Sequence, residues 1–186
     1  MTTANKITVL RMVLVPVFMA FLLVPESVPC LTTAIIIFIL ASVSDAVDGY
    51  IARHYNQITT FGKFMDPLAD KMLTTSAFIV FVACGRMSPW ALMIILFREF
   101  MVSGIRLLAV SDGKVIAASM LGKIKTVSQM LAITAGMILM YPLFPAAAAG
   151  VVTHALIWIC TVFTVISGID YLLKNIHIFK AKEEQE

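Results

Sequence analysis

Charged residues are scarce in this chain. Asp, Glu, Lys and Arg make up 13% of its 186 residues, whereas about a quarter is typical of soluble globular domains. Hydrophobic residues make up 60% of the chain, and the mean hydropathy is +0.96. This scarcity of charge argues against an ordinary soluble domain. The composition predicts an integral membrane protein.

Signs of a division into domains are also lacking. No Ser/Gly-rich linker or low-complexity stretch interrupts the sequence, and no repeat recurs at the period of a solenoid. Cys30, Cys84 and Cys160 stand singly in or beside apolar runs, so we interpret them as small packing residues rather than disulfide partners or metal ligands. We therefore expect a single membrane domain over residues 1–186.

Long apolar runs, by contrast, are abundant. A helix that crosses a bilayer needs about 20 mostly apolar residues. Six runs of this kind cover approximately residues 7–24, 30–53, 64–84, 89–110, 122–141 and 146–173. The predicted fold is therefore an all-α integral membrane protein with six transmembrane helices.

Lysine and arginine are concentrated at one set of helix ends. These ends hold Lys6, Arg11, Arg53, Lys63, Lys114, Lys123, Lys125, Lys174, Lys180 and Lys182. The opposite loops hold only Arg86, with Glu26 as their sole acid. Because Lys and Arg are retained on the cytoplasmic side of a membrane, both termini are expected in the cytoplasm, which agrees with an even number of spans.

Four aspartates interrupt the apolar pattern between the second and third runs. The stretch "SDAVDGYIARHYNQITTFGKFMDPLADKM" contains Asp45, Asp48, Asp66 and Asp70. A carboxylate in the hydrocarbon costs a few kcal/mol, and such residues usually mark a functional site. Spacings of three and four residues place each pair on one helix face. In the six-span topology all four lie near the cytoplasmic side, where antiparallel packing of the two helices would bring the pairs together.

The type of these side chains indicates a metal site. Carboxylates that meet in a medium of low dielectric repel one another unless cations neutralise them. Oxygen ligands without His or Cys suit hard cations such as Mg²⁺ or Mn²⁺, and two such ions are suited to phosphoryl chemistry. Gly49 and Ala52 continue the first face and leave room for a ligand. The alternative is that the acids form structural ion pairs with Arg53, Lys63 or Lys71.

The spacing of the whole segment carries a family resemblance. It reads Asp45-x2-Asp48-Gly49-x2-Ala52-Arg53-x8-Gly62-x3-Asp66-x3-Asp70, which resembles the signature of the CDP-alcohol phosphatidyltransferases at every position. The resemblance implies a six-helix membrane enzyme, usually a homodimer, whose four aspartates hold two divalent cations around the diphosphate of a CDP-linked lipid. It implies that Asp70 is also the base that activates the acceptor hydroxyl. The implied donor-binding residues are Asp48, Gly49, Ala52, Arg53 and Gly62.

A second group of charges concerns the acceptor. Arg98 and Arg106 lie in "FREFMVSGIR", eight residues apart and therefore on roughly the same helix face. Lys123 and Lys125 follow in "GKIKTVSQ". These four cations would suit an acceptor that carries a phosphate, with arginine as a bidentate donor, and Glu99 could orient one of them. The alternative is that Lys123 and Lys125 are ordinary residues of the cytoplasmic side.

Three stretches narrow the resemblance further. "NKITVLRMVLVPVF", "FREFMVSGIR" and "GKIKT" are similar to the bacterial phosphatidylglycerophosphate synthases. This resemblance implies CDP-diacylglycerol as donor, sn-glycerol 3-phosphate as acceptor, and a multi-pass enzyme of the bacterial cell membrane whose active site faces the cytoplasm. We expect direct transfer, because no Ser, His or Cys lies within the aspartate motif on a matching face; Ser44 is the nearest exception. No nucleic-acid partner is expected.

Two other functions stay open at this stage. A sister enzyme could use phosphatidylglycerol, inositol phosphate or serine as its acceptor, and inositol phosphate would satisfy the basic group equally well. A cation transporter would also place acids inside the membrane. The aspartates, however, are all predicted at one shallow depth, and the outer half of the six runs offers no polar path.

Overall fold

Six α-helices make up the described part of the molecule. The computed structural model describes residues 3–54, 60–111 and 119–176, with side chains throughout except at residues 3–5, 45–54, 60–64, 66, 67, 70, 110 and 111. The helices are α1 (Thr3–Leu22), α2 (Val28–His54), α3 (Thr60–Ala83), α4 (Pro89–Ser111), α5 (Met120–Ile138) and α6 (Ala146–Asn175). Each corresponds to one predicted run, with ends that differ by a few residues. The all-helical prediction is thus confirmed for the described ranges.

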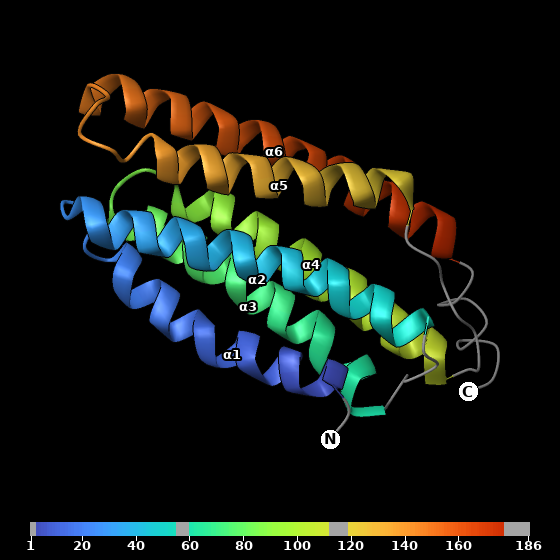
Figure 1. The fold of residues 1–186 in the computed structure, drawn as a ribbon. Helices are drawn as coiled ribbons and strands as arrows, with labels where there is room; N and C mark the ends of the chain where they lie inside the picture. The colour runs from blue at the N-terminus through green and yellow to red at the C-terminus, as the bar shows by residue number, and fades with distance from the viewer. Residues whose placement is uncertain (1–2, 55–59, 112–118, 177–186) are drawn as a thin grey trace.

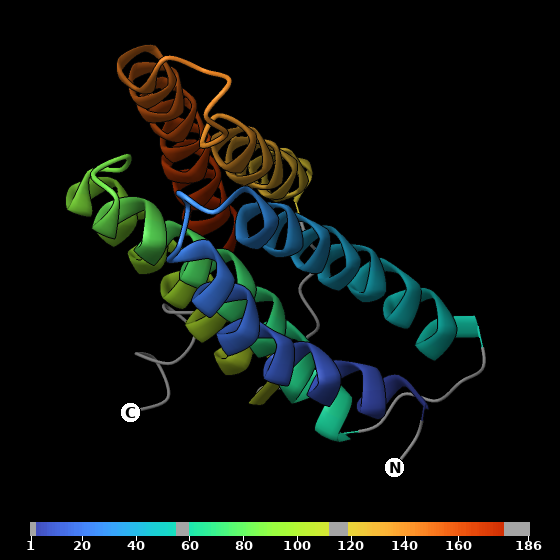
Figure 2. The same ribbon diagram turned by 60° about the vertical axis from the view of Figure 1, so that its left-hand side comes forward.

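Consecutive helices run in opposite directions, so their ends gather at two ends of the bundle (Figure 1). α1 packs against α2 and α3, while α6 packs against α5 and α4. In the turned view, α5 and α6 form a pair beside the other helices (Figure 2). The end of α2, the start of α3, the end of α4 and the start of α5 share one end of the bundle. We call it the aspartate end, because all four motif aspartates belong to the α2 and α3 segments there.

The main hydrophobic core fills the half of the bundle away from the aspartate end. Phe18, Phe38, Phe78, Phe81 and Ile133 are each no more than 1% exposed there. The rings of Phe18 and Phe38 are tilted against each other, with their centroids 5.7 Å apart, a separation typical of favourable aromatic pairs. The apolar packing therefore holds the helices together without occupying the region of the motif.

Two glycines in this half are required by local geometry. A Cβ at Gly136 of α5 would lie 2.8 Å from ring carbons of Phe81 in α3, so only a glycine lets the two helices approach this closely. Gly85 follows α3 with φ of 66°, a left-handed conformation that favours glycine. It turns the chain so that the amide of Arg86 donates to the carbonyl of Phe81 at 2.7 Å.

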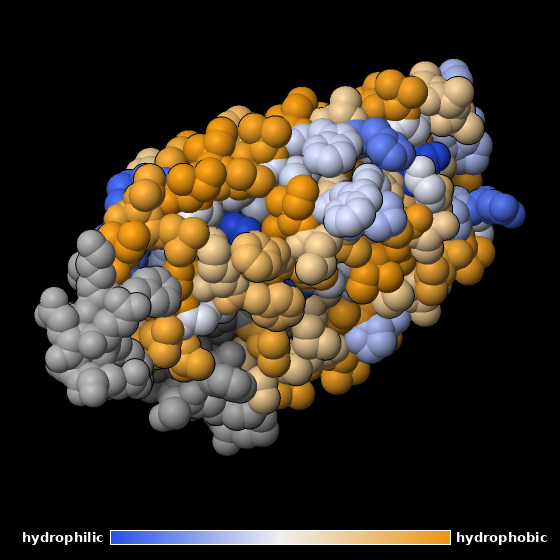
Figure 3. All heavy atoms as spheres, turned by 180° about the vertical axis from the view of Figure 1, so that it is seen from behind, coloured by the Kyte–Doolittle hydropathy of each residue, from blue (hydrophilic) through white to orange (hydrophobic). Residues whose placement is uncertain are grey.

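Large apolar side chains cover much of the outside of the molecule. Figure 3 shows a broad hydrophobic surface on one face, and the most exposed side chains include Leu131 at 65% and Val151 at 71%. Apolar surfaces of this extent usually contact a membrane or a partner. Within the described residues, α6 is the one helix whose length and composition suffice to cross a membrane. The six spans and the cytoplasmic termini stay predictions.

Candidate active site

The motif aspartates lie at the facing ends of two antiparallel helices. Asp45 and Asp48 belong to the final turns of α2, and Asp66 and Asp70 to the first turns of α3. Their side chains, like those of Gly49, Ala52, Arg53 and Gly62, are outside the described part of the structure. Among the side chains that are described, no group of three or more His, Cys, Asp or Glu could hold a metal ion. The fit to divalent cations thus rests on carboxylate chemistry and on helix register.

α1 contributes a buried cation that contacts α2 just before the aspartate motif. The side chain of Arg11 is 1% exposed, and its Nη2 donates to Ser44 Oγ at 3.5 Å, one residue before Asp45. Thr8, one turn earlier in α1, is likewise 1% exposed. From its sequence, Arg11 was predicted only as one of the charges on the cytoplasmic side. A threonine and an arginine three residues apart in an apolar run share a helix face, and this pattern could have indicated the site.

Glu99 of α4 contacts basic side chains from three helices. Its Oε1 accepts a hydrogen bond from Nζ of Lys125 in α5, and a second at 3.5 Å from Nη1 of Arg98. Its Oε2 lies 3.9 Å from Nζ of Lys71 in α3. We call Lys71, Arg98, Glu99 and Lys125 the Glu99 cluster. It joins three cations to one carboxylate among the described side chains.

The members of the Glu99 cluster are largely removed from solvent. The exposed fraction of the side chain is 6% for Lys125, 10% for Arg98 and 15% for Glu99. Nε of Arg98 is buried and has no hydrogen-bond partner among the described atoms. Buried charges require compensation. An anionic ligand could accept a hydrogen bond from Nε of Arg98.

Arg98 lies between α5 and α6. A Cβ at Gly168 of α6 would come within 3.0 Å of Arg98 Cγ, so the glycine makes room for the aliphatic part of the arginine. A Cβ at Gly122 of α5 would lie 3.7 Å from Arg98 Nη2. The guanidinium therefore lies beside the first turn of α5, where the amide of Gly122 donates to the capping hydroxyl of Ser119. The positive end of a helix reinforces an anion site.

The remaining predicted acceptor residues are placed differently. Arg106 also faces α6, where its Nε donates to Tyr171 Oη at 3.4 Å and its guanidinium lies 5.7 Å from the ring centroid. Lys123 is exposed. The structure thus brings Arg98 and Lys125 to one carboxylate, holds Arg106 two turns further along α4, and leaves Lys123 outside the Glu99 cluster.

Lys71 was absent from the predicted acceptor group. Its Nζ donates to Ser103 Oγ and, at 3.2 Å, to the carbonyl of Glu99. In the sequence it was considered only as a structural partner for the aspartates. The described partners of its ammonium belong instead to α4, and nothing in the local sequence around Asp70 indicates them.

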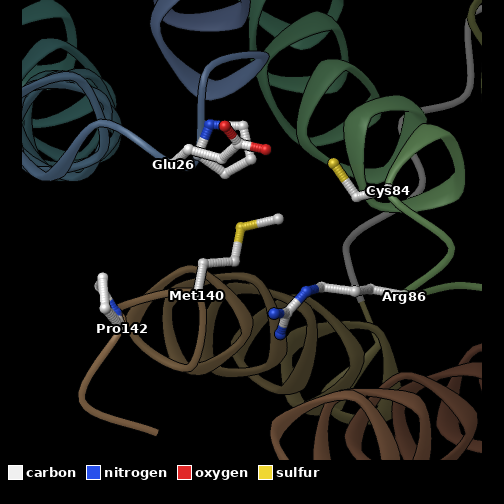
Figure 4. A pocket seen from close by; sticks show the side chains of 6 residues that line it. Glu26, Cys84, Arg86, Met140 and Pro142 are labelled. Atoms are coloured by element: carbon white, nitrogen blue, oxygen red, sulfur yellow. The ribbon is translucent and has the colours of Figure 1, made fainter. Parts of the chain in front are cut away.

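A cavity of about 450 Å³ lies at the other end of the bundle. Figure 4 shows the side chains around it, from the turns after α1, α3 and α5. The lining residues are Pro25, Glu26, Cys84, Arg86, Met140 and Pro142. All three cysteines are free, which agrees with the prediction, although Cys84 is exposed rather than packed. The cavity contains no part of the motif, so we assign the candidate active site to the aspartate end.

Comparison with known proteins decides the family. The family model described as CDP-alcohol phosphatidyltransferase matches residues 1–166. The chain belongs to the CDP-alcohol phosphatidyltransferase family. The matched range contains the complete aspartate motif and all four residues of the Glu99 cluster.

Individual relatives in this family cover nearly the whole chain. The CDP-diacylglycerol–glycerol-3-phosphate 3-phosphatidyltransferase of Bacillus subtilis is 42% identical over 186 residues, covering 92% of this chain and 93% of the relative. The protein of the same name from Rickettsia typhi is 34% identical, covering 90% and 93%. A probable phosphatidylglycerophosphate synthase of Mycobacterium tuberculosis is 39% identical, covering 92% and 80%.

Proposed function

We propose that this chain transfers the phosphatidyl group of CDP-diacylglycerol to sn-glycerol 3-phosphate, giving phosphatidylglycerophosphate and CMP. Membership of the CDP-alcohol phosphatidyltransferase family and the names of the relatives support the reaction class and the acceptor. The structural observation that supports this acceptor is the Glu99 cluster. It brings three cations together around one carboxylate, and Nε of Arg98 has no hydrogen-bond partner among the described atoms, so the cluster suits an acceptor that carries a phosphate.

The acceptor phosphate is bound at the Glu99 cluster, with Arg98 and Lys125 as its principal partners. Arg98 offers a planar guanidinium suited to bidentate contact with phosphate. Arg106 is held against Tyr171 and guides the anion along α4. Lys123 is exposed and adds only to the general attraction for anions at this end of the bundle.

The aspartates carry the chemistry. Asp70 accepts the proton of the acceptor's 1-hydroxyl as that oxygen attacks the lipid-side phosphorus, and CMP leaves. Asp45, Asp48, Asp66 and Asp70 would hold two divalent cations, Mg²⁺ or Mn²⁺, which stabilise negative charge on the diphosphate. The donor nucleotide lies against Gly49 and Ala52, with Asp48, Arg53 and Gly62 also in contact with the donor. Transfer is direct, without a covalent phosphatidyl-enzyme.

The enzyme works in the bacterial cell membrane with six spans and a cytoplasmic active site. Two observations support this arrangement: the exposed apolar side chains around the bundle and the concentration of Lys and Arg in the segments that the sequence predicts on the cytoplasmic side. The diacylglycerol chains stay in the bilayer while glycerol 3-phosphate enters from the cytoplasm. The family resemblance supports a homodimer as the working form.

Purified protein offered CDP-diacylglycerol with a panel of alcohols tests the proposal. The panel contains glycerol 3-phosphate, inositol phosphate, phosphatidylglycerol and serine, and the readouts are CMP release and the identity of the lipid product. We expect phosphatidylglycerophosphate as the main product. A different lipid product would reassign the acceptor within the family, and failure to release CMP with every alcohol would refute the enzyme assignment.

A further inference from the structure

Lys71 links α3, which carries Asp70, to α4, which carries Arg98 and Glu99 of the proposed acceptor site. It is the residue after Asp70 in α3, and its ammonium is directed to α4. There it donates to Ser103 Oγ and to the carbonyl of Glu99, with Glu99 Oε2 3.9 Å away. Ser103 Oγ itself donates to the same Glu99 carbonyl at 2.7 Å. Three polar groups from one turn of α4 thus surround one ammonium.

These contacts account for all three N–H donors of the Lys71 ammonium. Two are used by Ser103 and by the Glu99 carbonyl, and the third faces the Glu99 carboxylate. Little capacity is left for direct contact with an acceptor phosphate. Arg98, by contrast, keeps a buried Nε without a described partner. The contacts of Lys71 therefore join helices, while those of Arg98 leave a donor for a ligand.

Adjacent residues of a helix cannot move independently. Lys71 and Asp70 are separated by about 1.5 Å along the axis and about 100° around it. Anchoring the ammonium of Lys71 on α4 therefore restrains both the height and the rotation of the α3 turn that carries Asp70. We propose that Lys71 is a positioning residue, which holds this turn against α4 and so positions Asp70 relative to the acceptor bound at the Glu99 cluster. The inference rests on the proposed function, because it takes Asp70 as the base.

The test compares Lys71→Met with wild type in steady-state kinetics, each substrate varied in turn. Misplacement of a reacting group by about 1 Å can cost roughly a hundredfold in rate, so we expect kcat to fall by roughly tenfold to a hundredfold. The KM for glycerol 3-phosphate should stay near its wild-type value. Lys71→Arg should recover much of kcat, since a guanidinium can donate to the same groups of α4. Lys174→Met is the matched control, because Lys174 pairs with Asp170 on the exposed side of α6.

A second variant tests the same contact by changing the partner of Lys71 on α4. Ser103→Ala removes one acceptor of Lys71 and should lower kcat by less than Lys71→Met does. The double variant should be no slower than Lys71→Met alone, because both changes break the same contact. If Lys71→Met does not fold, Ser103→Ala and Lys71→Arg carry the test, and full kcat in Ser103→Ala would overturn the proposal.

Other outcomes would also refute it. A raised KM for glycerol 3-phosphate with unchanged kcat would make Lys71 a ligand of the acceptor phosphate. Unchanged kinetics with a lowered melting temperature would show that Lys71 contributes to stability and does not position Asp70. If wild-type protein uses another alcohol of the panel, the proposed acceptor is wrong but the comparison is repeated with that alcohol. Failure of the proposed function is thereby distinguished from failure of the Lys71 inference.

Discussion

Replacing Lys125 and Lys123 separately by methionine tests the position of the acceptor site. The two lysines are close neighbours on the same helix and are chemically identical, but their surroundings differ. Lys125 is buried and donates to Glu99, whereas Lys123 is exposed. Methionine preserves much of the aliphatic length of either side chain and removes the ammonium group with its charge and its N–H donors. The pair therefore separates a specific contact from the general attraction of a basic surface.

The burial of the donor determines the expected magnitude. Lys125→Met removes a buried donor of the Glu99 cluster, while Lys123→Met removes an exposed one. A hydrogen bond to a charged group contributes about 1.5–3 kcal/mol, and about 1.4 kcal/mol is a factor of ten in binding. We expect Lys125→Met to raise the KM for glycerol 3-phosphate roughly tenfold to a hundredfold. An exposed charge contributes at most about 1 kcal/mol, so Lys123→Met should have a much smaller effect.

The assay is CMP release in detergent micelles with each substrate varied in turn, at low and at moderate salt. Added salt should weaken the acceptor's apparent affinity more in wild type than in Lys125→Met, since fewer charges remain to be screened. The KM for CDP-diacylglycerol should change little in either variant. Equal effects of the two substitutions on glycerol 3-phosphate would refute the assignment of its phosphate to the Glu99 cluster.

Further expectations concern the base, the metal, the arginines and the core. Asp70→Asn should lower kcat by roughly 10²–10⁴-fold with CDP-diacylglycerol still bound; near-normal turnover would remove it from that role. EDTA should silence the enzyme and Mg²⁺ or Mn²⁺ restore it, whereas activity in metal-free buffer would contradict the two-metal proposal. Arg98→Ala and Arg106→Ala should raise the KM for glycerol 3-phosphate more than that for CDP-diacylglycerol, with Arg98 the larger effect because it is buried; equal effects on both substrates would indicate a structural role. Gly136→Ala should lower stability by about 1–3 kcal/mol through overpacking against Phe81, seen as a lower melting temperature in detergent, and an unchanged melting point would show that the ring gives way.

Local features of the chain were predictable from sequence. The six helices follow from apolar runs broken by "PESVP", by the glycine turn at Gly85 and by "YPLFP", because a backbone in an apolar run must satisfy its hydrogen bonds within the segment. The aspartate motif was readable for a similar reason. Its eight residues lie within residues 45–70, so their spacing is visible without knowledge of the packing.

Contacts between helices were decided by the tertiary structure. Glu99 stands next to Arg98 in sequence, yet it also receives Lys125 from α5 and approaches Lys71 from α3. No spacing rule connects residues 26 or 28 positions apart in separate helices. The space for the Arg98 side chain likewise depends on Gly168 of α6, which the sequence does not single out.

The two lysines of α5 show most clearly the difference between what the sequence determines and what the tertiary structure determines. In the sequence, Lys123 and Lys125 form one basic group, and both were predicted to bind the acceptor phosphate. On a helix they differ by about 200° of rotation, so only one of them can face the interior. Which one does so depends on how α5 is turned against α6 and α3, where Gly136 packs closely against Phe81. Side-chain identity and spacing were present in the sequence, but the rotation of the helix came only from the assembled bundle.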